Sequence, residues 1–418
     1  MPIEMVELQM ATAAPSPALK PSPRPTLLKL CGAALYVGTV GYGGPAILAQ
    51  MKRTFVDERA WLSERDFMDA LSLAQILPGA TGVSLMGYIG HKLRSPWGGI
   101  LVPVCFVLPA AVLMLVASWA YFRYQGIKAV QSLFTGLGAL VVALLVNATL
   151  KLGQSVFKRR MVSEYRGVLI AVIAFLGFYF ERINVIVLTV GAGMLGLVFY
   201  YSANDSEHHD AAKGHFVAPG RKSDAVRKPY VALLVTGLIA FSMICFPLPR
   251  RIFATFFGIG TFAFGSGFAA IPLIQSRIVS QLHWLSLAQF RDGIALGQVT
   301  PGPVFITATF IGYKVMGFVG ALVATVAIFM PSLAGMIALS EVHNAIRHLK
   351  PIRAIIRGFL AGFIGLLVAV TVQFAVKSLV GWQTWLIFCS SLALILYYKK
   401  DVLWAIAGTV VASLVLFQ

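Results

Sequence analysis

The chain has 418 residues, of which 58% are hydrophobic and only 12% are charged, and its 34 lysine and arginine residues outnumber 16 acidic residues to give a formal net charge of +18. Globular domains carry about 25% charged residues, so this composition excludes an ordinary soluble protein. The basic residues stand in short clusters between long apolar runs, which is typical of loops at an anionic membrane surface and argues against nucleic-acid binding.

Apolar runs of about 18 or more residues are long enough to cross a hydrocarbon layer of about 30 Å. The sequence therefore predicts an all-α integral membrane protein with about 13 transmembrane helices. The predicted spans are residues 27–50, 67–93, 96–121, 129–150, 167–180, 183–201, 230–248, 252–275, 287–314, 317–340, 354–376, 380–397 and 402–417.

Two polar stretches lie outside these spans. Residues 1–26 are rich in proline and are predicted to form a disordered cytoplasmic tail, and residues 202–229 are predicted to form a cytoplasmic linker. The linker contains three histidines, and the four cysteines lie far apart inside apolar runs. Neither set has the spacing of a structural metal site, so we expect no metal and no cofactor.

The basic residues also predict an orientation. With 13 crossings and a cytoplasmic N-terminus, 23 of the 34 lysine and arginine residues fall on the cytoplasmic side. This bias agrees with the positive-inside rule, which relates basic loops to the cytoplasm. It predicts a C-terminus on the opposite, periplasmic side.

The chain repeats itself. The segment from Trp61 to Gly79 and the segment from Trp284 to Gly302 share nine identical residues out of nineteen without a gap. The predicted repeats are residues 27–201 and 249–418, six spans each, with an extra helix at 230–248 between them. An odd number of crossings between the halves inverts the second half, which is an architecture of secondary transporters.

Each half contains a Pro-Gly pair in the middle of a long apolar run. Proline removes a hydrogen-bond donor and glycine relaxes the backbone, so each helix is expected to break there. The new helix beyond each break begins with free N–H groups, which predicts a site for a tetrahedral oxyanion at the interface of the repeats. The expected binding residues are Gly43, Gly44, Pro45, Gln75, Pro78, Gly79, Thr81, Gly265, Ser266, Gly267, Gln298, Pro301, Gly302 and Thr307.

Five ionisable residues lie near these breaks in the sequence, namely Asp69, Lys92, Arg94, Asp292 and Lys314. Asp69 and Asp292 repeat in register and either carry protons or cap a helix N-terminus. Lys92, Lys314 and Arg94 either extend to a membrane surface or attract the anion.

A glycine motif from Gly191 to Gly196 has the spacing of a dinucleotide-binding fingerprint. It lies inside an apolar span with no strand before it, so we interpret it as a close helix-packing face instead.

The sequence resembles the chromate ion transporter family, in its long two-domain form, over nearly the whole chain. The resemblance rests on Tyr42 to Pro45, Trp61 to Gly79, and their counterparts Phe264 to Gly267 and Trp284 to Pro303. It implies a bacterial inner-membrane protein that exports chromate, driven by the proton motive force, and confers chromate resistance, with sulfate as the structural analogue. In the first half Gly79 is followed by Ala80 rather than proline, so the two half-sites could be unequal.

Other functions stay open at this point. Sulfate or molybdate transport would use the same donors, and so would an anion channel. An enzyme would need a cluster of nucleophilic or metal-binding residues, whereas the paired motifs supply hydrogen-bond donors. The expected partners are a chromate- or sulfate-type oxyanion and the lipid bilayer, with no nucleic acid, and a homodimer is left open.

Overall fold

The computed structural model describes residues 25–42, 44–77, 79–157, 161–181, 183–201, 247–263, 267–346, 350–398 and 401–417. The tail up to residue 24, the linker 202–229 and residues 230–246 of the predicted extra helix lie outside this part of the chain. So do Gly43, Pro78, Gly265 and Ser266 of the predicted site.

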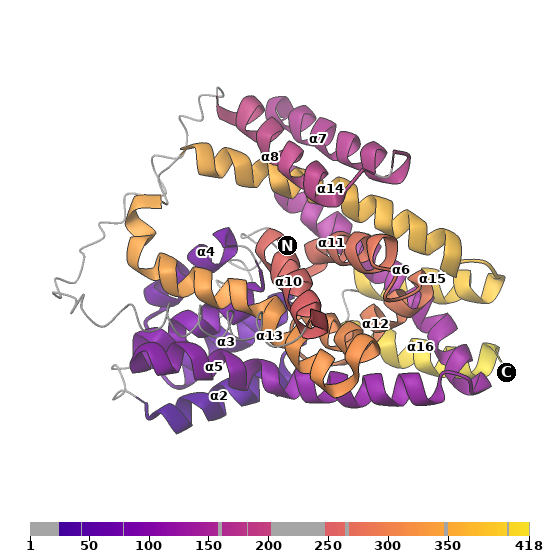
Figure 1. The fold of residues 1–418 in the computed structure, drawn as a ribbon, viewed down its shortest axis with the longest axis horizontal. Helices are drawn as coiled ribbons and strands as arrows, with labels where there is room; N and C mark the ends of the chain where they lie inside the picture. Colours follow the sequence, from indigo (N-terminus) through magenta and orange to yellow (C-terminus); the bar gives the residue numbers. More distant parts are fainter. Residues whose placement is uncertain are drawn as a thin grey trace.

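The described chain is helical throughout (Figure 1). The first half contains α2 (Leu27–Val40), α3 (Gly44–Lys52), the π-helix η1 (Arg53–Glu58), α4 (Glu64–Ile76), α5 (Thr81–Tyr124), α6 (Lys128–Phe157), α7 (Met161–Tyr179) and α8 (Val185–Tyr201). The second half contains α10 (Pro247–Phe262), η2 (Gly267–Ala269), α11 (Ala270–Gln275), the π-helix η3 (Ser276–Gln281), α12 (Leu287–Val299), η4 (Val304–Ile306), α13 (Thr307–Ile346), α14 (Lys350–Ser378), α15 (Trp382–Leu396) and α16 (Val402–Leu416). No strand occurs among the described residues, which confirms the all-α prediction.

The repeat in the sequence is also a repeat in the backbone. Each half has a π-helix of six residues, followed by a residue with a positive φ, 47° at Ala60 and 50° at His283. A tryptophan N–H then donates to a carbonyl of that π-helix, over 3.0 Å from Trp61 and 2.9 Å from Trp284. Features this unusual recur together only if the two segments fold alike.

Serine residues begin the helices that follow. The Ser63 hydroxyl accepts a hydrogen bond from the N–H of Asp66 at the start of α4, and Ser286 accepts one from the N–H of Gln289 at the start of α12, each over 3.1 Å. Serine is a preferred N-cap because its oxygen satisfies a free N–H of the first turn. Asp69 and Asp292 are therefore not the caps, so the capping interpretation was wrong.

The two predicted spans 67–93 and 287–314 are helical hairpins rather than single helices. In the first half, Lys92 pairs with Asp66 over 2.6 Å, which brings the far ends of α4 and the first part of α5 together. In the second half, a Cβ on Gly293 would lie 2.6 Å from the ring of Phe310, and one on Gly297 would lie 2.9 Å from the Thr307 hydroxyl. The chain therefore turns back at each break.

The helices α5 and α13 each reverse direction once more. A Cβ on Gly90 would collide with the carbonyl of Gly98, although eight residues of straight helix span about 12 Å. Gly312 and Gly320 approach each other in the same way, next to non-helical backbone at 316–317 in α13. We call residues 81–94 and 97–124 the first and second arms of α5, and 307–315 and 318–346 those of α13.

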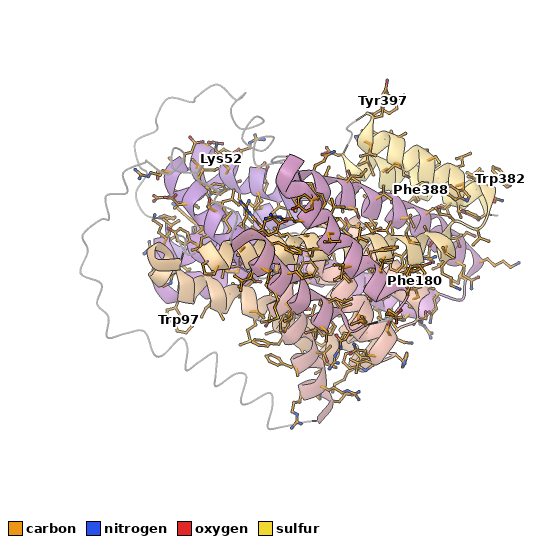
Figure 2. All side chains as sticks on the ribbon, turned by 90° about the horizontal axis from the view of Figure 1, so that it is seen from above. Lys52, Trp97, Phe180, Trp382, Phe388 and Tyr397 are labelled. Carbon is orange, nitrogen blue, oxygen red and sulfur yellow. The ribbon has the colours of Figure 1, made fainter. Side chains whose placement is uncertain are left out.

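Four described segments are long and apolar enough to cross a membrane, namely Trp97–Tyr124, Lys128–Gln154, Val304–Met336 and Ala354–Ser378. Five further apolar helices are shorter, namely Leu27–Val40, Tyr165–Tyr179, Val185–Tyr200, Trp382–Leu396 and Val402–Leu416. Exposed aromatic residues stand at helix ends, among them Trp97, Phe180, Trp382 and Tyr397, which Figure 2 labels. Aromatic side chains gather in this way where lipid meets water.

Helices of each half pack against helices of the other half. Helices α7 and α8 of the first half pack against α14, and α15 and α16 of the second half pack against α6. We call the N end of the bundle the end where Arg94 donates to the carbonyl of Pro25, and the C end the one where Ser132 donates to the carbonyl of Phe417. In Figure 1 the N-end helices α2 to α4 lie on the left and the chain ends on the right.

Candidate functional site

The break in each half is hydrogen-bonded to the other half. The N–H of Gly79 donates to the carbonyl of Ala263 over 2.5 Å, and the N–H of Gly302 donates to the carbonyl of Gly41 over 2.9 Å. Tyr42 and Gly302 also form an isolated parallel bridge. Gly41 is the first residue after α2 and Ala263 is the first residue after α10. These two residues correspond to each other in the repeat, so the two halves make matching bonds.

Both breaks depend on a glycine in the left-handed region. Gly79 has a φ of 100° and Gly302 a φ of 112°. A residue with a Cβ is strained at such angles, whereas glycine adopts them readily. Each helix before the break ends in extended backbone, at Leu77 after α4 and at Thr300 after α12. This confirms that the predicted Pro-Gly positions interrupt the helices.

Long helices of the opposite half support the two breaks unequally. The N–H of Ala80 donates to the Ser332 hydroxyl over 2.9 Å, and a Cβ on Gly79 would collide with that hydroxyl. At the other break, a Cβ on Gly302 would lie 2.7 Å from the Cβ of Ala110. Only the first break therefore receives a side-chain oxygen from its supporting helix.

The predicted binding residues that the structure describes lie around the breaks. Gln75 is exposed in the last turn of α4 and Pro301 is buried, while Gly44 and Pro45 begin α3. A Cβ on Gly267 would lie 3.0 Å from Val304, so η2 lies against η4. The two predicted threonines differ in burial. Thr81 is half-buried at the start of α5, whereas Thr307 is 1% exposed and its hydroxyl donates to the carbonyl of Val304.

The amide of Gln298 carries an unused donor. Its Nε2 atom is buried and has no hydrogen-bond partner, one turn before the second break. A buried polar group without a partner costs about 1–3 kcal/mol. Native proteins retain such groups where water, an ion or a ligand satisfies them.

The basic residues near the breaks lie at the far ends of the hairpins. Lys92 pairs with Asp66, Arg94 donates to the carbonyl of Pro25 over 2.5 Å, and the Lys314 ammonium lies 5.1 Å from the centre of the Phe122 ring. Burial would raise the pKa of Asp66, but the hydrogen bonds of Lys92 and Ser63 outweigh it and lower that pKa. These contacts hold the hairpin ends together.

The two predicted acidic residues have different surroundings. Asp69 is half-buried on α4. Asp292 is 6% exposed on α12 and accepts hydrogen bonds from Arg291 and from the Tyr121 hydroxyl. Sequence reasoning missed Ser332, Arg291 and Tyr121. Ser332 falls opposite Ala110 when the repeats are aligned, and that difference was the available signal for it.

Most of the chain is similar in sequence to known proteins. The sequence profile of the chromate transporter family matches residues 28–197 and 250–414. The chain is 33% identical to a chromate transport protein of Cupriavidus metallidurans, over 91% of this chain and 90% of that protein, and 30% identical to one of Pseudomonas aeruginosa, over 82% and 79%. It is also 31% identical to an uncharacterized transporter of Methanocaldococcus jannaschii, over 90% of each chain. No solved structure matches significantly.

Proposed function

The chain belongs to the chromate transporter family, and on that premise we propose that it exports chromate from the bacterial cytoplasm across the inner membrane by alternating access. The observation that carries the proposal is the reciprocal bonding of the breaks, Gly79 to Ala263 and Gly302 to Gly41. It joins the break of each half to a helix end of the other half. Because the N–H groups of Gly79, Ala80 and Gly302 already have acceptors in the protein, the N–H groups of the helix turns that follow are proposed to bind the anion, which places no full charge in lipid.

The unused donor of Gln298 supports an oxyanion as the ligand. Chromate offers four oxygen atoms that accept hydrogen bonds, and the amide Nε2 of Gln298 has two N–H groups to donate. At the other break the Ser332 hydroxyl accepts a hydrogen bond from the N–H of Ala80. Its own O–H is proposed to donate to an oxygen of the anion. The proposed site therefore combines backbone, amide and hydroxyl donors.

We further propose that the two halves are inverted repeats. The exchanged bonds at the breaks and the exchanged packing of α7 and α8 against α14, and of α15 and α16 against α6, support a pseudo-two-fold axis between them. An axis in the membrane plane is how transporters with inverted repeats build two alternating openings around one site.

The hairpins reduce the proposed number of crossings from thirteen to nine. We place α2–α3 and α4 with the first arm of α5 as re-entrant hairpins from the N end, and α10–α11 and α12 with the first arm of α13 as re-entrant hairpins from the C end. A helix arm of 13 residues, such as α4, reaches only about 20 Å and does not cross a layer of about 30 Å. The proposed crossings are the second arm of α5, α6, α7, α8, a segment within residues 230–246, the second arm of α13, α14, α15 and α16.

The distribution of basic residues favours nine crossings over thirteen. Nine of the 34 lysine and arginine residues then fall at the C end, namely Arg123, Lys128, Arg182, Arg250, Arg251, Arg277, Arg291, Lys314 and Lys377, and the other 25 fall at the N end. The nine-crossing arrangement thus places 25 basic residues on one side, compared with 23 for 13 crossings. It supports a cytoplasmic N end and a periplasmic C-terminus.

The membrane potential favours export. Moving one charge through 100 mV changes the free energy by about 2.3 kcal/mol, so a chromate dianion that leaves a negative interior releases about 4.6 kcal/mol. Import would need co-transported cations.

The transport proposal is tested in inside-out vesicles prepared from the membranes of cells that produce the protein. Labelled chromate is expected to accumulate inside them when a potential or a pH gradient is imposed. Labelled sulfate, offered alone and as a competitor, decides which oxyanion is carried. Accumulation of neither anion would contradict the transporter assignment, and a rate that rises with anion concentration without saturating would favour a channel.

Replacing Gln298 with leucine is expected to lower chromate transport about ten-fold, because one charge-assisted hydrogen bond contributes about 1.5–3 kcal/mol. The measurement is the initial rate of chromate uptake in the vesicles, normalised to the amount of protein. Gln125→Leu is the control, because Gln125 is exposed between α5 and α6, away from the breaks. Equal rates for Gln298→Leu and the control would remove Gln298 from the site.

The nine-crossing arrangement is tested by single cysteines in a variant without the four native cysteines. A membrane-impermeant maleimide added to intact spheroplasts is expected to label Gly126→Cys, between α5 and α6, and to spare the exposed Asp57→Cys in η1. Thirteen crossings place both residues in the periplasm. Labelling of both cysteines would therefore restore the thirteen-helix topology.

A further inference from the structure

A buried charged cluster closes the C end of the bundle. One oxygen of Asp292 accepts hydrogen bonds from the guanidinium of Arg291 over 2.9 and 3.1 Å, and the other accepts one from the Tyr121 hydroxyl over 2.9 Å. Arg291 also donates to the Ser378 hydroxyl over 3.0 Å. We call these four residues the C-end cluster.

The C-end cluster joins both halves of the protein. Arg291 and Asp292 belong to α12 and Ser378 to α14, whereas Tyr121 comes from α5 in the first half. The fourth neighbour is α6, where a Cβ on Gly138 would lie 2.8 Å from the guanidinium of Arg291. The helix α6 thus passes close to Arg291 because residue 138 has no side chain, and α12 packs along α6.

The described ion pairs at the N end, among them Lys92 with Asp66 and Lys52 with Glu64, lie within the first half and do not join the two halves. The repeat alignment places Asp69 opposite Asp292 but Met68 opposite Arg291, so the position of the guanidinium is taken by a thioether. Among the described helices, α12 packs against α6, whereas the corresponding pair, α4 and α14, shares at most a marginal contact. The two ends of the bundle therefore differ in how tightly the hairpin is held.

Exposure along α4 and α12 shows the same difference. Ser72 is exposed on α4, whereas its counterpart Ala295 is 2% exposed on α12. The accessible face of α4 carries Arg65, Asp69, Ser72 and Gln75, at the spacing of one helix face. A face this polar is suited to water rather than to lipid, and it leads from the N end to the first break.

We infer that the C-end cluster is the gate that closes the anion site toward the C end, that Arg291 is its positioning residue, and that the site opens toward the N end along the polar face of α4. This inference rests on the proposed transport function. Opening toward the C end requires α12 to leave Tyr121 and α6, which separates Asp292 from the Tyr121 hydroxyl. The N-end gate, with Met68 in place of Arg291, closes without an ion pair at that position.

The gate is tested by the labelling rates of matched cysteines in the variant without native cysteines. Ser72→Cys is expected to react with an impermeant maleimide in inside-out vesicles, and Ala295→Cys is expected to react from neither side. If Ala295→Cys reacts in right-side-out vesicles as fast as Ser72→Cys reacts in inside-out vesicles, the assignment of the open and closed ends is wrong.

The role of the ion pair is tested by Arg291→Met with Asp292→Asn, which removes both charges together and gives α12 the residue type found at Met68. In this background Ala295→Cys is expected to react about ten-fold faster in right-side-out vesicles, because the closed state loses its stabilising contacts. An unchanged rate at an unchanged protein level contradicts the gate. If the double variant is not produced, Tyr121→Phe removes only the hydroxyl that donates to Asp292. Faster labelling of Ala295→Cys in right-side-out vesicles is again expected, and an unchanged labelling rate again contradicts the gate.

These results are separable from the transport proposal. Cysteine labelling needs no substrate. The expected labelling rates without any chromate flux would therefore support the gate and reject chromate as the substrate. Chromate flux together with equal labelling of Ser72→Cys and Ala295→Cys would keep the transporter and refute the gate.

Discussion

Replacing either Gly79 or Gly302 with alanine is expected to abolish most chromate transport while leaving the protein in the membrane. Both glycines have a φ above 90°, where a side chain costs about 1–3 kcal/mol of strain. An alanine Cβ at position 79 also collides with the Ser332 hydroxyl, and one at position 302 lies 2.7 Å from Ala110. The break must therefore shift, and with it the N–H groups proposed to bind the anion.

The measurement is the rate of chromate uptake in vesicles at matched protein levels, with an expected loss of at least about ten-fold for each variant. Gly32→Ala on α2 is the control, because a Cβ there has nothing within 4 Å. Wild-type rates for Gly79→Ala and Gly302→Ala would mean that the two interruptions have no part in binding.

The two variants are expected to differ in how they can be rescued. Ser332→Ala removes the atom with which a Cβ at position 79 would collide, but it also removes the acceptor for the N–H of Ala80. We therefore expect partial recovery of Gly79→Ala at most. No substitution at Ser332 should affect Gly302→Ala, because that break lies against Ala110.

Replacing Gly196 with leucine is expected to cause the largest loss of folded protein. A Cβ on Gly196 would lie 2.5 Å from the Cα of Gly358, so the helices α8 and α14 meet there backbone to backbone. Inserting a large side chain into such a contact costs about 1–3 kcal/mol or more. The expected result is a lower apparent melting temperature and less monodisperse protein after detergent extraction.

Gly191→Leu is the matched control on the same helix. A Cβ at that position has nothing within 4 Å, so the variant is expected to behave like the wild type. Equal losses for both variants would show that any leucine in this apolar helix is harmful, and the close approach to α14 would not be the cause.

The sequence predicted the helix interruptions because a Pro-Gly pair is a local signal and it occurs twice in register. The packing face from Gly191 to Gly196 was predicted for a similar reason. It is confirmed at Gly193, which lies against Phe359, and at Gly196, which lies against Gly358, but not at Gly191, which faces open space. Both features depend on the residue itself and on its immediate neighbours in the chain.

The direction of the chain after a break could not be predicted in this way. The apolar run 67–93 is continuous in composition, and only the pairing of Asp66 with Lys92 shows that it turns back. Arg291 entered the sequence analysis only through the charge count. Ser378, to which it donates, and Tyr121, which donates to the neighbouring Asp292, are both distant in the sequence. Contacts between distant segments determine both features, and a single sequence does not record them.

The packing of α7 and α8 against α14 has a consequence for biosynthesis. About 150 residues separate the end of α8 from the start of α14, and a ribosome that adds about 5–20 residues per second needs roughly 8–30 s to make them. During that interval the glycine face of α8 has no partner in the nascent chain. The first half is therefore incompletely packed until residues 350–378 enter the membrane. Interrupted translation would leave this incompletely packed half exposed to membrane proteases.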